Sequence, residues 1–190
     1  KIIFTAGNGK GFDYGISKDE SGTNYYGYTP WCLSRGTLTE LVFEEGVKHI
    51  GRYSFLGCDS VRSVTFPKSL KDIDAFSFFG CKSIESIALP EGIECIGDSS
   101  FRNCTSITSL NIPGSVKYIG DFAFSHCSLL KTIEIPDNVE YIGKFAFYIF
   151  FAQNFSKFRA VISVFFGINR NFKRFVSQKN ISKIRKPFFK

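Results

Sequence analysis

The cysteines are the first residues of this chain whose chemistry could be functional. Four of the six, Cys58, Cys81, Cys104 and Cys127, are spaced by 23 residues. A zinc site needs four ligands that converge on one metal, and the chain has no Cys-x-x-Cys pair. Even spacing instead predicts parallel side chains, one per structural repeat, which is poor geometry for a disulfide. We interpret these four as buried free thiols and expect neither a metal nor a cofactor.

The remaining cysteines and the two histidines offer little for catalysis. Cys32 and Cys95 lie outside the cysteine column; Cys95 is expected to be half exposed, and a disulfide between them stays open in an oxidising compartment. His49 and His126 fall at variable positions of the repeat, so no nucleophile, base and orienting group is predicted around them. We therefore expect that the protein is not an enzyme.

The N-terminal residues hold two groups that resemble ligand sites. Gly7, Gly9 and Gly11 follow a strand-like run, but the third glycine of a dinucleotide fingerprint would fall at Phe12 and no apolar helix follows. We interpret them as a turn cluster. The second group is aromatic and is expected to form an apolar lid over the first repeat, the alternative being a ligand cage; its members are Tyr25, Tyr26, Tyr28 and Trp31.

The elements that position these residues follow from one 23-residue repeat, present five times between residues 38 and 153. Apolar residues recur at positions one, four and six of the unit. In the fourth copy they are Ile107, Leu110 and Ile112, and the remaining apolar columns contain Val116, Ile119 and Phe124. The phenylalanine column is invariant: Phe55, Phe78, Phe101, Phe124 and Phe147. The repeat must therefore define both the core and the fold.

Each column of the unit predicts a local structure. Positions four and six point to one face of a short strand, which is the core face. Proline at position seven of the later copies ends that strand because it cannot donate to a ladder. Position 14, directly after the isoleucine column, holds Gly51, Asp74, Gly97, Gly120 and Gly143, which predicts a turn with positive φ. A short helical or 3₁₀ turn is then expected to bury the phenylalanine.

Because one unit cannot bury its apolar face alone, the copies are expected to stack as coils at about 4.8 Å spacing. We predict a leucine-rich-repeat solenoid of the α/β type, in which short parallel strands stack coil on coil and helical or 3₁₀ turns lie opposite. The expected organisation is an N-terminal flank or cap over residues 1–37, five repeats over 38–153 and a tail over 154–190.

The repeat resembles the BspA-like class of leucine-rich repeats, written LxxIxIPxxVxxIGxxAFxxCxxL. The resemblance rests on residues 107–127 and their counterparts in the other copies, and it covers residues 38 to about 149. The segment Tyr28-Thr-Pro-Trp31 also resembles the flank that precedes such arrays in bacterial surface proteins. The resemblance implies a cell-surface or secreted protein that binds host, matrix or cell-surface proteins, and it brings no catalytic residues.

The variable strand positions are the predicted binding surface, because they face outward while their neighbours face the core. They are mostly small and weakly polar and include no aromatic or arginine anchor. A solvated sheet face with the ligand site elsewhere remains the alternative. The residues are Glu40, Val42, Ser63, Thr65, Ser86, Ala88, Ser109, Asn111, Thr132 and Glu134.

Charge is distributed unevenly. The net charge of +7 conceals a division, since residues 1–150 carry 14 Lys/Arg and 17 Asp/Glu, whereas residues 151–190 carry ten Lys/Arg, no acidic residue and nine Phe. A basic aromatic tail could bind an acidic membrane surface or nucleic acid. It could equally be a divergent cap, a poorly ordered extension or the product of a shifted reading frame over an AT-rich repeat. These interpretations stay open.

The most direct function for such an array is noncovalent binding of a protein partner; a structural spacer that presents other domains is the second hypothesis. The chain contains no Met and opens on Lys1, so we expect a fragment or processed chain whose signal peptide or anchor could lie in the missing ends. The longest apolar run, Ala160 to Ile168, is too short to span a membrane. No small-molecule substrate is expected.

Overall fold

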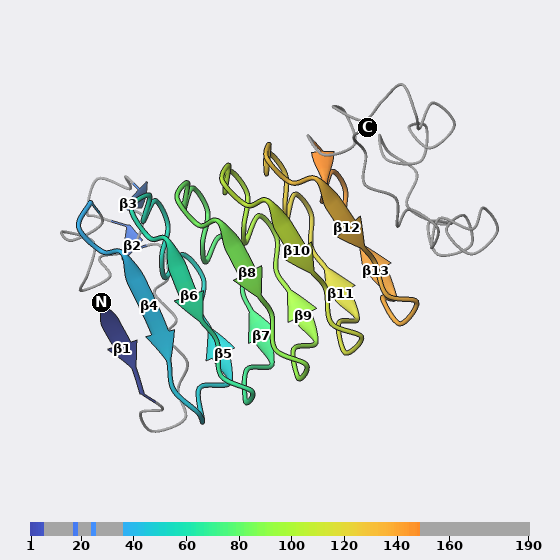
Figure 1. Cartoon of the computed structure of the whole chain (residues 1–190), viewed down its shortest axis with the longest axis horizontal. Helices are drawn as coiled ribbons and strands as arrows, with labels where there is room; N and C mark the ends of the chain where they lie inside the picture. The colour runs from blue at the N-terminus through green and yellow to red at the C-terminus, as the bar shows by residue number, and fades with distance from the viewer. Residues whose placement is uncertain (6–16, 19–23, 26–35, 149–190) are drawn as a thin grey trace.

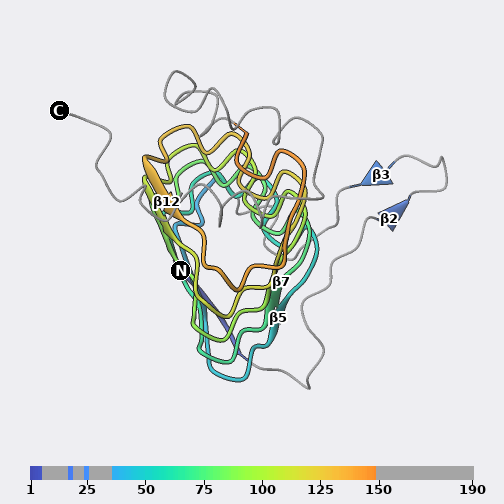
Figure 2. The same ribbon diagram turned by 90° about the vertical axis from the view of Figure 1, so that its right-hand side faces the viewer.

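A computed structural model describes residues 1–5, 17–18, 24–25 and 36–148. Over residues 36–148 the chain forms a parallel β-solenoid in which each 23-residue unit makes one coil (Figure 1). Seen along its axis, two sheets face each other and a stack of turns joins them across the wide end of the coil (Figure 2). We call these three sides the first sheet, the second sheet and the turn side.

The first sheet contains the strands predicted from positions three to six of the unit. Its strands are β1 (Ile2–Phe4), β4 (Glu40–Phe43), β6 (Ser63–Thr65), β8 (Ser86–Ala88), β10 (Ser109–Asn111) and β12 (Thr132–Glu134). β1, β4 and β6 form one parallel ladder, β8, β10 and β12 form another, and β6 lies beside β8 (Figure 1). Equivalent residues pair, as in Leu110 with Ile133, so the register equals the repeat.

The second sheet was not predicted. Its five parallel strands have two residues each: β5 (His49–Ile50), β7 (Asp72–Ile73), β9 (Cys95–Ile96), β11 (Tyr118–Ile119) and β13 (Tyr141–Ile142). The isoleucine of each strand is buried, and the residue before it faces outward and is at least partly exposed. Two residues are too few to produce an alternating pattern in the sequence, which is why the unit appeared to hold one strand.

The N-terminal residues add one strand in front of the first coil. β1 pairs in register with β4, with Ile2 opposite Leu41 and Phe4 opposite Phe43. The ring of Phe4 stacks on Phe43 at 4.8 Å and meets Phe55 edge-on at 5.3 Å. β1 therefore continues the core by half a coil. A separate antiparallel pair is formed by β2 (Ser17–Lys18) and β3 (Asn24–Tyr25).

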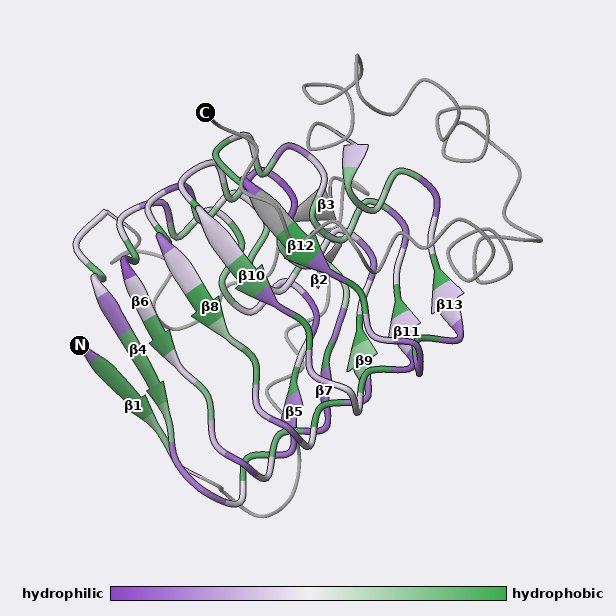
Figure 3. Ribbon diagram, turned by 45° about the vertical axis from the view of Figure 1, so that its right-hand side comes forward, coloured by the Kyte–Doolittle hydropathy of each residue, from purple (hydrophilic) through white to green (hydrophobic). Residues whose placement is uncertain are grey.

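The core runs along the axis of the solenoid between the two sheets, and the apolar bands of the strands follow it (Figure 3). Its centre is the predicted phenylalanine ladder, in which neighbouring rings stack with centroids 5.1 to 5.4 Å apart. Each of these rings is at most 1% exposed. Offset or parallel stacking of this kind adds to the free energy of burial, so the ladder ties successive coils together.

The turn side consists of successive i to i+3 turns, and no helix precedes residue 148 in the described part of the array. In the first coil the amides of Leu56 and Cys58 donate to the carbonyls of Tyr53 and Phe55 at 3.2 and 3.1 Å. Alternate amides also donate to the next coil, as from Phe55 to Ser77 at 2.7 Å. The chain is thus bonded to its neighbours on all three sides of the coil, which leaves no room for a full helical turn.

The glycine column does not adopt the positive φ predicted for it. Positive φ occurs instead within the turn side, at Tyr53, Phe76, Ser99, Phe122 and Phe145, with φ between 53° and 59°, and again four residues later in each of the first four coils. Gly97, Gly120 and Gly143 are required for a different reason: a Cβ there would overlap the preceding coil. At Gly97 it would lie 2.6 Å from the backbone nitrogen of Ala75.

Candidate binding surfaces

The predicted binding residues form two parallel rows on the outer face of the first sheet. Glu40 pairs with Ser63 and Val42 with Thr65, while in the second ladder Ser86, Ser109 and Thr132 align, as do Ala88, Asn111 and Glu134. Glu40 and Val42 are partly exposed. The six predicted residues between Ser63 and Asn111 are exposed, and so is Glu134. The structure therefore brings the predicted residues together on one face of the described array.

The side chains at the centre of these rows are short and mostly polar. Hydroxyls, a methyl group and an amide occupy the centre, from Ser63 to Asn111, and glutamates lie near both ends at Glu40 and Glu134. Lys1 forms an ion pair with Glu40 at 3.3 Å. A face of short side chains on paired strands is flat, so it suits a broad contact with another macromolecule better than enclosure of a small ligand.

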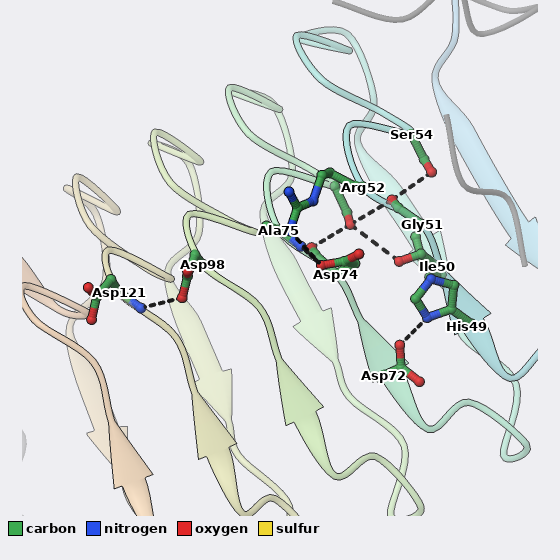
Figure 4. A network of polar contacts seen from close by, with 11 residues as sticks. His49, Ile50, Gly51, Arg52, Ser54, Asp72, Asp74, Ala75, Asp98 and Asp121 are labelled. Atoms are coloured by element: carbon green, nitrogen blue, oxygen red, sulfur yellow. Dashed lines mark hydrogen bonds and ion pairs between the residues drawn. The ribbon is translucent and has the colours of Figure 1, made fainter. Parts of the chain in front are cut away.

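The outer face of the second sheet was missed by sequence reasoning. Its strands carry His49, Asp72, Cys95, Tyr118 and Tyr141 in one aligned row. The imidazole of His49 contacts the carboxylate of Asp72, and the ion pair of Arg52 with Asp74 (3.8 Å) lies beside them (Figure 4). A repeated aspartate after the glycine column was the available signal.

The carboxylates of this face also join one coil to the next. The backbone amide of Asp121 donates to the Asp98 carboxylate at 2.8 Å, and the amide of Lys144 donates to the Asp121 carboxylate at 2.6 Å. Tyr118 and Tyr141 stack beside them with ring centroids 4.7 Å apart. Burial, and then the charge of Asp98, raise the pKa of Tyr118 to about 12. The Tyr118 hydroxyl is therefore protonated at physiological pH.

The turn side holds a second set of aromatic residues, of which Tyr53 is buried and Phe76, Phe122 and Phe145 are partly exposed. Tyr53 stacks on Phe76 and Phe122 on Phe145, at 5.1 and 5.2 Å. Ser99 interrupts this column, and the guanidinium of Arg102 lies beside the gap, 5.0 Å from the centre of the Phe122 ring and 5.8 Å from that of Phe79. Arg102 thus continues the aromatic column by cation–π contact. The 23-residue spacing of these rings was visible in the sequence.

The cysteine column is buried as predicted. Cys58, Cys81, Cys104 and Cys127 are free thiols, at most 1% exposed. The last three donate to the carbonyl of the phenylalanine 26 residues earlier, at 3.2 to 3.4 Å. Burial raises the pKa of Cys104 well above its ordinary value and that of Cys127 to about 12. Such thiols are protonated and unreactive at neutral pH.

Cys95 is a free, half-buried thiol on the second sheet. Its pKa is raised, first by burial and then by the charges of Asp72, Asp74 and Asp98. An attacking thiolate needs the opposite environment, one with nearby positive charge. Although His49, Asp72 and Cys95 share a row, the aspartate lies between the other two, so the histidine is not placed to take a proton from the thiol.

One further pair has the composition of a catalytic site. The Ser125 hydroxyl and the His126 ring nitrogen lie 2.8 Å apart. Ser125 is completely buried, so its oxygen cannot reach a substrate carbonyl in this conformation. Among the described residues no group of three or more His, Cys, Asp or Glu side chains is arranged to hold a metal ion.

Several predicted features lie outside the described residues. These are the glycine cluster, the rings of Tyr26, Tyr28 and Trp31, the thiol of Cys32 and the tail. For Tyr25 only the backbone strand is described. The apolar cover over the first coil that is described comes from Phe4 of β1. In the described part of the chain no helix is long and apolar enough to cross a membrane.

Comparison with known families supports the interpretation of the repeat. A family model described as "BspA type Leucine rich repeat region (6 copies)" matches residues 31–154 and 103–190. The model has six copies, one more than the five counted from the sequence columns. Among proteins with curated descriptions, none matches the chain significantly.

Three solved structures are similar to the chain. A leucine rich cell surface protein from Faecalibacterium prausnitzii A2-165 is 22% identical with a TM-score of 0.51, over 79% of this chain and 45% of that one. The T. pallidum Leucine Rich Repeat protein is 23% identical with a TM-score of 0.48, over 56% and 60% of the two chains. A leucine-rich repeat protein from Bacteroides ovatus is 20% identical with a TM-score of 0.35, over 76% of this chain and 48% of that one. The chain thus matches about half the length of these proteins, and the first likeness supports the solenoid fold.

Proposed function

The chain belongs to the BspA-type leucine-rich-repeat family, and from this premise we propose that it is a non-catalytic protein-binding module of a cell-surface or secreted protein. The observation that carries the proposal is the outer face of the first sheet. Two aligned rows of exposed side chains run along the described array without an intervening loop. Within each ladder the strands beneath are hydrogen-bonded in register, so the rows are held in place and little conformational entropy is lost on binding.

The partner surface is expected to be broad and at least partly polar. Specific protein interfaces bury about 800 Å² on each partner, and a small flat row of Ser, Thr and Asn side chains supplies hydrogen bonds over such an area without a deep pocket. The proposed contact residues are Glu40, Val42, Ser63, Thr65, Ser86, Ala88, Ser109, Asn111, Thr132 and Glu134. The candidate partners are host, matrix or cell-surface proteins.

The test is to immobilise the full chain and measure its binding to a panel of purified matrix glycoproteins and serum proteins. The informative variant is the pair Ser86→Arg and Ser109→Arg, which places two long cations at the centre of one row. Both positions are exposed and paired in register, so the fold should tolerate the change. We expect the dissociation constant of any retained partner to rise by about tenfold or more, because the centre of a protein interface tolerates little added bulk or charge.

The matched control is the pair Ser83→Arg and Ser106→Arg. These serines precede the same two strands, are partly exposed and add the same charge, but lie at the corner towards the turn side. A partner that is equally weakened by both pairs would contradict binding through the first sheet.

A spacer that presents other domains is the second candidate, and one observation favours it. The outward residues of the first sheet are mostly small, and hydrogen bonds join successive coils on all three sides. Such a rod holds its ends apart regardless of what its faces contact. Failure of the full chain to retain any member of the panel, with the fold intact, would favour the spacer over the binding module.

A further inference from the structure

The turn side combines a single charged side chain with many aromatic ones. Each coil contributes one turn segment to it, and these segments are residues 53–58, 76–81, 99–104, 122–127 and 145–148. Arg102 is the only Lys, Arg, Asp or Glu among them. Around it, Phe76, Phe79 and Phe122 are partly exposed. Apolar side chains that reach the surface together mark contact sites on proteins.

Arg102 lies at the interruption of the aromatic column. Coil three has Ser99 at the column position, a residue that is 3% exposed and offers no ring. The Arg102 guanidinium lies beside this gap, 5.0 Å from the centre of the Phe122 ring and 5.8 Å from that of Phe79. Two cation–π contacts therefore hold the charged group at a fixed place on the turn side.

The guanidinium of Arg102 has no counter-charge. Among the described residues its side chain forms no ion pair and no hydrogen bond, and its Nε is buried without an acceptor. The carboxylates of Asp98 and Asp121, at the corner towards the second sheet, accept from backbone amides instead, at 2.8 and 2.6 Å. A guanidinium has five N–H donors, and N–H groups in such surroundings normally find an acceptor. Arg102 thus presents unused donors and an uncompensated positive charge.

These surroundings determine which ligand chemistry fits. A carboxylate can accept two parallel N–H bonds from one guanidinium, and the pair is stronger where neighbouring rings exclude water. Nucleic acids and anionic membranes are held by several cations, whereas the turn segments supply one. The exposed rings, in turn, fit apolar side chains. An acidic residue flanked by aromatic or aliphatic residues in a partner protein matches both features.

The turn side also has the composition of an interface centre, which the first sheet does not have. Residues that dominate protein interfaces are enriched in Trp, Tyr and Arg and are surrounded by contacts that exclude water. The two rows of the first sheet contain neither an aromatic residue nor an arginine. On the turn side one arginine stands among three partly exposed rings.

We propose that the turn side around Arg102 is a second protein-binding surface, which recognises an acidic residue flanked by apolar residues. Arg102 donates two N–H bonds to the carboxylate of the partner. Phe76, Phe79 and Phe122 pack against the flanking side chains. This surface is separate from the rows of the first sheet, so the inference goes beyond the proposed function and does not depend on it.

The test selects ligands for the full chain from a phage-displayed library of random peptides. We expect enrichment of peptides that carry Asp or Glu next to Phe, Trp or Leu. Synthetic copies of these peptides are then titrated by fluorescence anisotropy against the unsubstituted chain and Arg102→Leu, which removes the charge and keeps an apolar side chain. The dissociation constant should rise by about tenfold or more in the variant.

A double-mutant cycle shows whether Arg102 contacts the carboxylate itself. Replacing the acidic residue of the peptide by its amide should weaken binding to the unsubstituted chain to a similar extent, but should weaken binding to Arg102→Leu little further. The matched control is Lys82→Leu, which removes an exposed cation beside the neighbouring turn segment. It should change the dissociation constant by less than about twofold.

Arg102→Lys is the second variant, and it decides the question if Arg102→Leu does not fold. It keeps the charge but loses the planar fork, so the dissociation constant should rise by a smaller factor than in Arg102→Leu and by more than in Lys82→Leu. Equal affinity of the unsubstituted chain and Arg102→Lys, together with an additive cycle, would overturn the proposal.

Three results of the selection would also overturn it. Enrichment of no peptide, or only of peptides without a carboxylate, would mean that the turn side does not recognise this chemistry. Loss of peptide binding in the pair Ser86→Arg and Ser109→Arg would place the peptides on the first sheet. Conversely, partners of the first sheet that bind Arg102→Leu normally would leave the proposed function intact, so the two proposals can fail separately.

Discussion

At the residue scale, the sequence correctly predicts that the glycine column excludes side chains, but the reason predicted for it is wrong. Its recurrence after each isoleucine was read as a need for positive φ, whereas Gly97 and its equivalents are needed because the neighbouring backbone leaves no room for a Cβ. A single sequence cannot distinguish these causes, since both exclude side chains. The distinction requires knowing how closely the coils approach.

The Gly97→Ala substitution is expected to destabilise the fold by about 1–3 kcal/mol, because the new methyl group would lie 2.6 Å from the backbone of Ala75 and Asp74. Gly114→Ala is the control. Its Cβ would meet nothing nearer than the Asn138 side chain at 3.9 Å, and its φ is not positive. Urea denaturation of both variants checks the prediction, and similar midpoints for the two would contradict it.

The buried thiols predict how stability depends on pH. Burial raises the pKa of Cys104 and Cys127 above the ordinary value of 9.0, so the folded state holds these protons more tightly than the unfolded state. Their contribution to stability is fully present below pH 9 and is lost as the pH rises towards 12. We expect the denaturation midpoint to fall above pH 9.

The double variant Cys104→Ala, Cys127→Ala should have a shallower decline between pH 9 and pH 11, even if its stability is lower throughout. Tyr118, whose pKa is also raised, remains in both proteins and contributes the same slope. Midpoints measured at intervals across this range provide the check. Parallel curves for the two proteins would mean that the cysteines do not titrate with unfolding.

At the scale of elements, the sequence predicted those strands that are long enough to alternate. Leu110 and Ile112, two residues apart and followed by Pro113, indicate a strand and its end. The second sheet could not be predicted in this way because each strand has two residues, and one buried isoleucine has no period. The small residue beside each phenylalanine, such as Ala123 beside Phe124, predicts a short helical or 3₁₀ turn, and the structure has i to i+3 turns there without a helix.

The binding rows were predictable because strand alternation fixes which side chains face outward. The second sheet's row and Arg102 were not predicted, since the strands of that sheet have two residues each and Arg102 lies in a turn, where no alternation fixes which side chains face outward. The signal that could have found the second sheet's row was the repeated aspartate after the glycine column. For the turn side, where Arg102 lies, it was the column of Tyr53, Phe76, Phe122 and Phe145, which recurs at the spacing of the unit.

The N-terminal strand offers a direct test of element packing. In β1, Phe4 is 4% exposed against the core and Ile3 is 52% exposed on the outer side. Phe4→Ser should destabilise the fold by about 2–4 kcal/mol because it removes a ring from Phe43 and Phe55. Ile3→Ser, the control in the same strand, should have an effect below about 0.5 kcal/mol. Thermal unfolding compares them, and equal shifts would exclude in-register pairing of β1.

At the scale of the whole molecule, each coil contacts only its neighbours, so stability is approximately a sum of coil and interface contributions. Phe101 belongs to two interfaces, since its ring stacks on Phe78 at 5.2 Å and on Phe124 at 5.3 Å. A change in the middle coil should therefore weaken both halves of the array, whereas a surface change should weaken neither.

We expect Phe101→Ala to cost about 3–5 kcal/mol and to accelerate hydrogen exchange in the coils on both sides, residues 61–83 and 107–129. Leu129→Ala, at a side chain that is 53% exposed, is the control and should leave exchange unchanged. Acceleration confined to residues 84–106 would contradict nearest-neighbour coupling.

The direction of the ladder bonds has a mechanical consequence. Because the strands lie across the axis, the hydrogen bonds that join coils, such as that from Gly120 to Ile96, run along it. Tension applied between the two ends would load these bonds in the direction in which they open, so coils would peel away singly instead of shearing together. Each released unit would lengthen the molecule by about 75 Å, making the array an extensible tether under load.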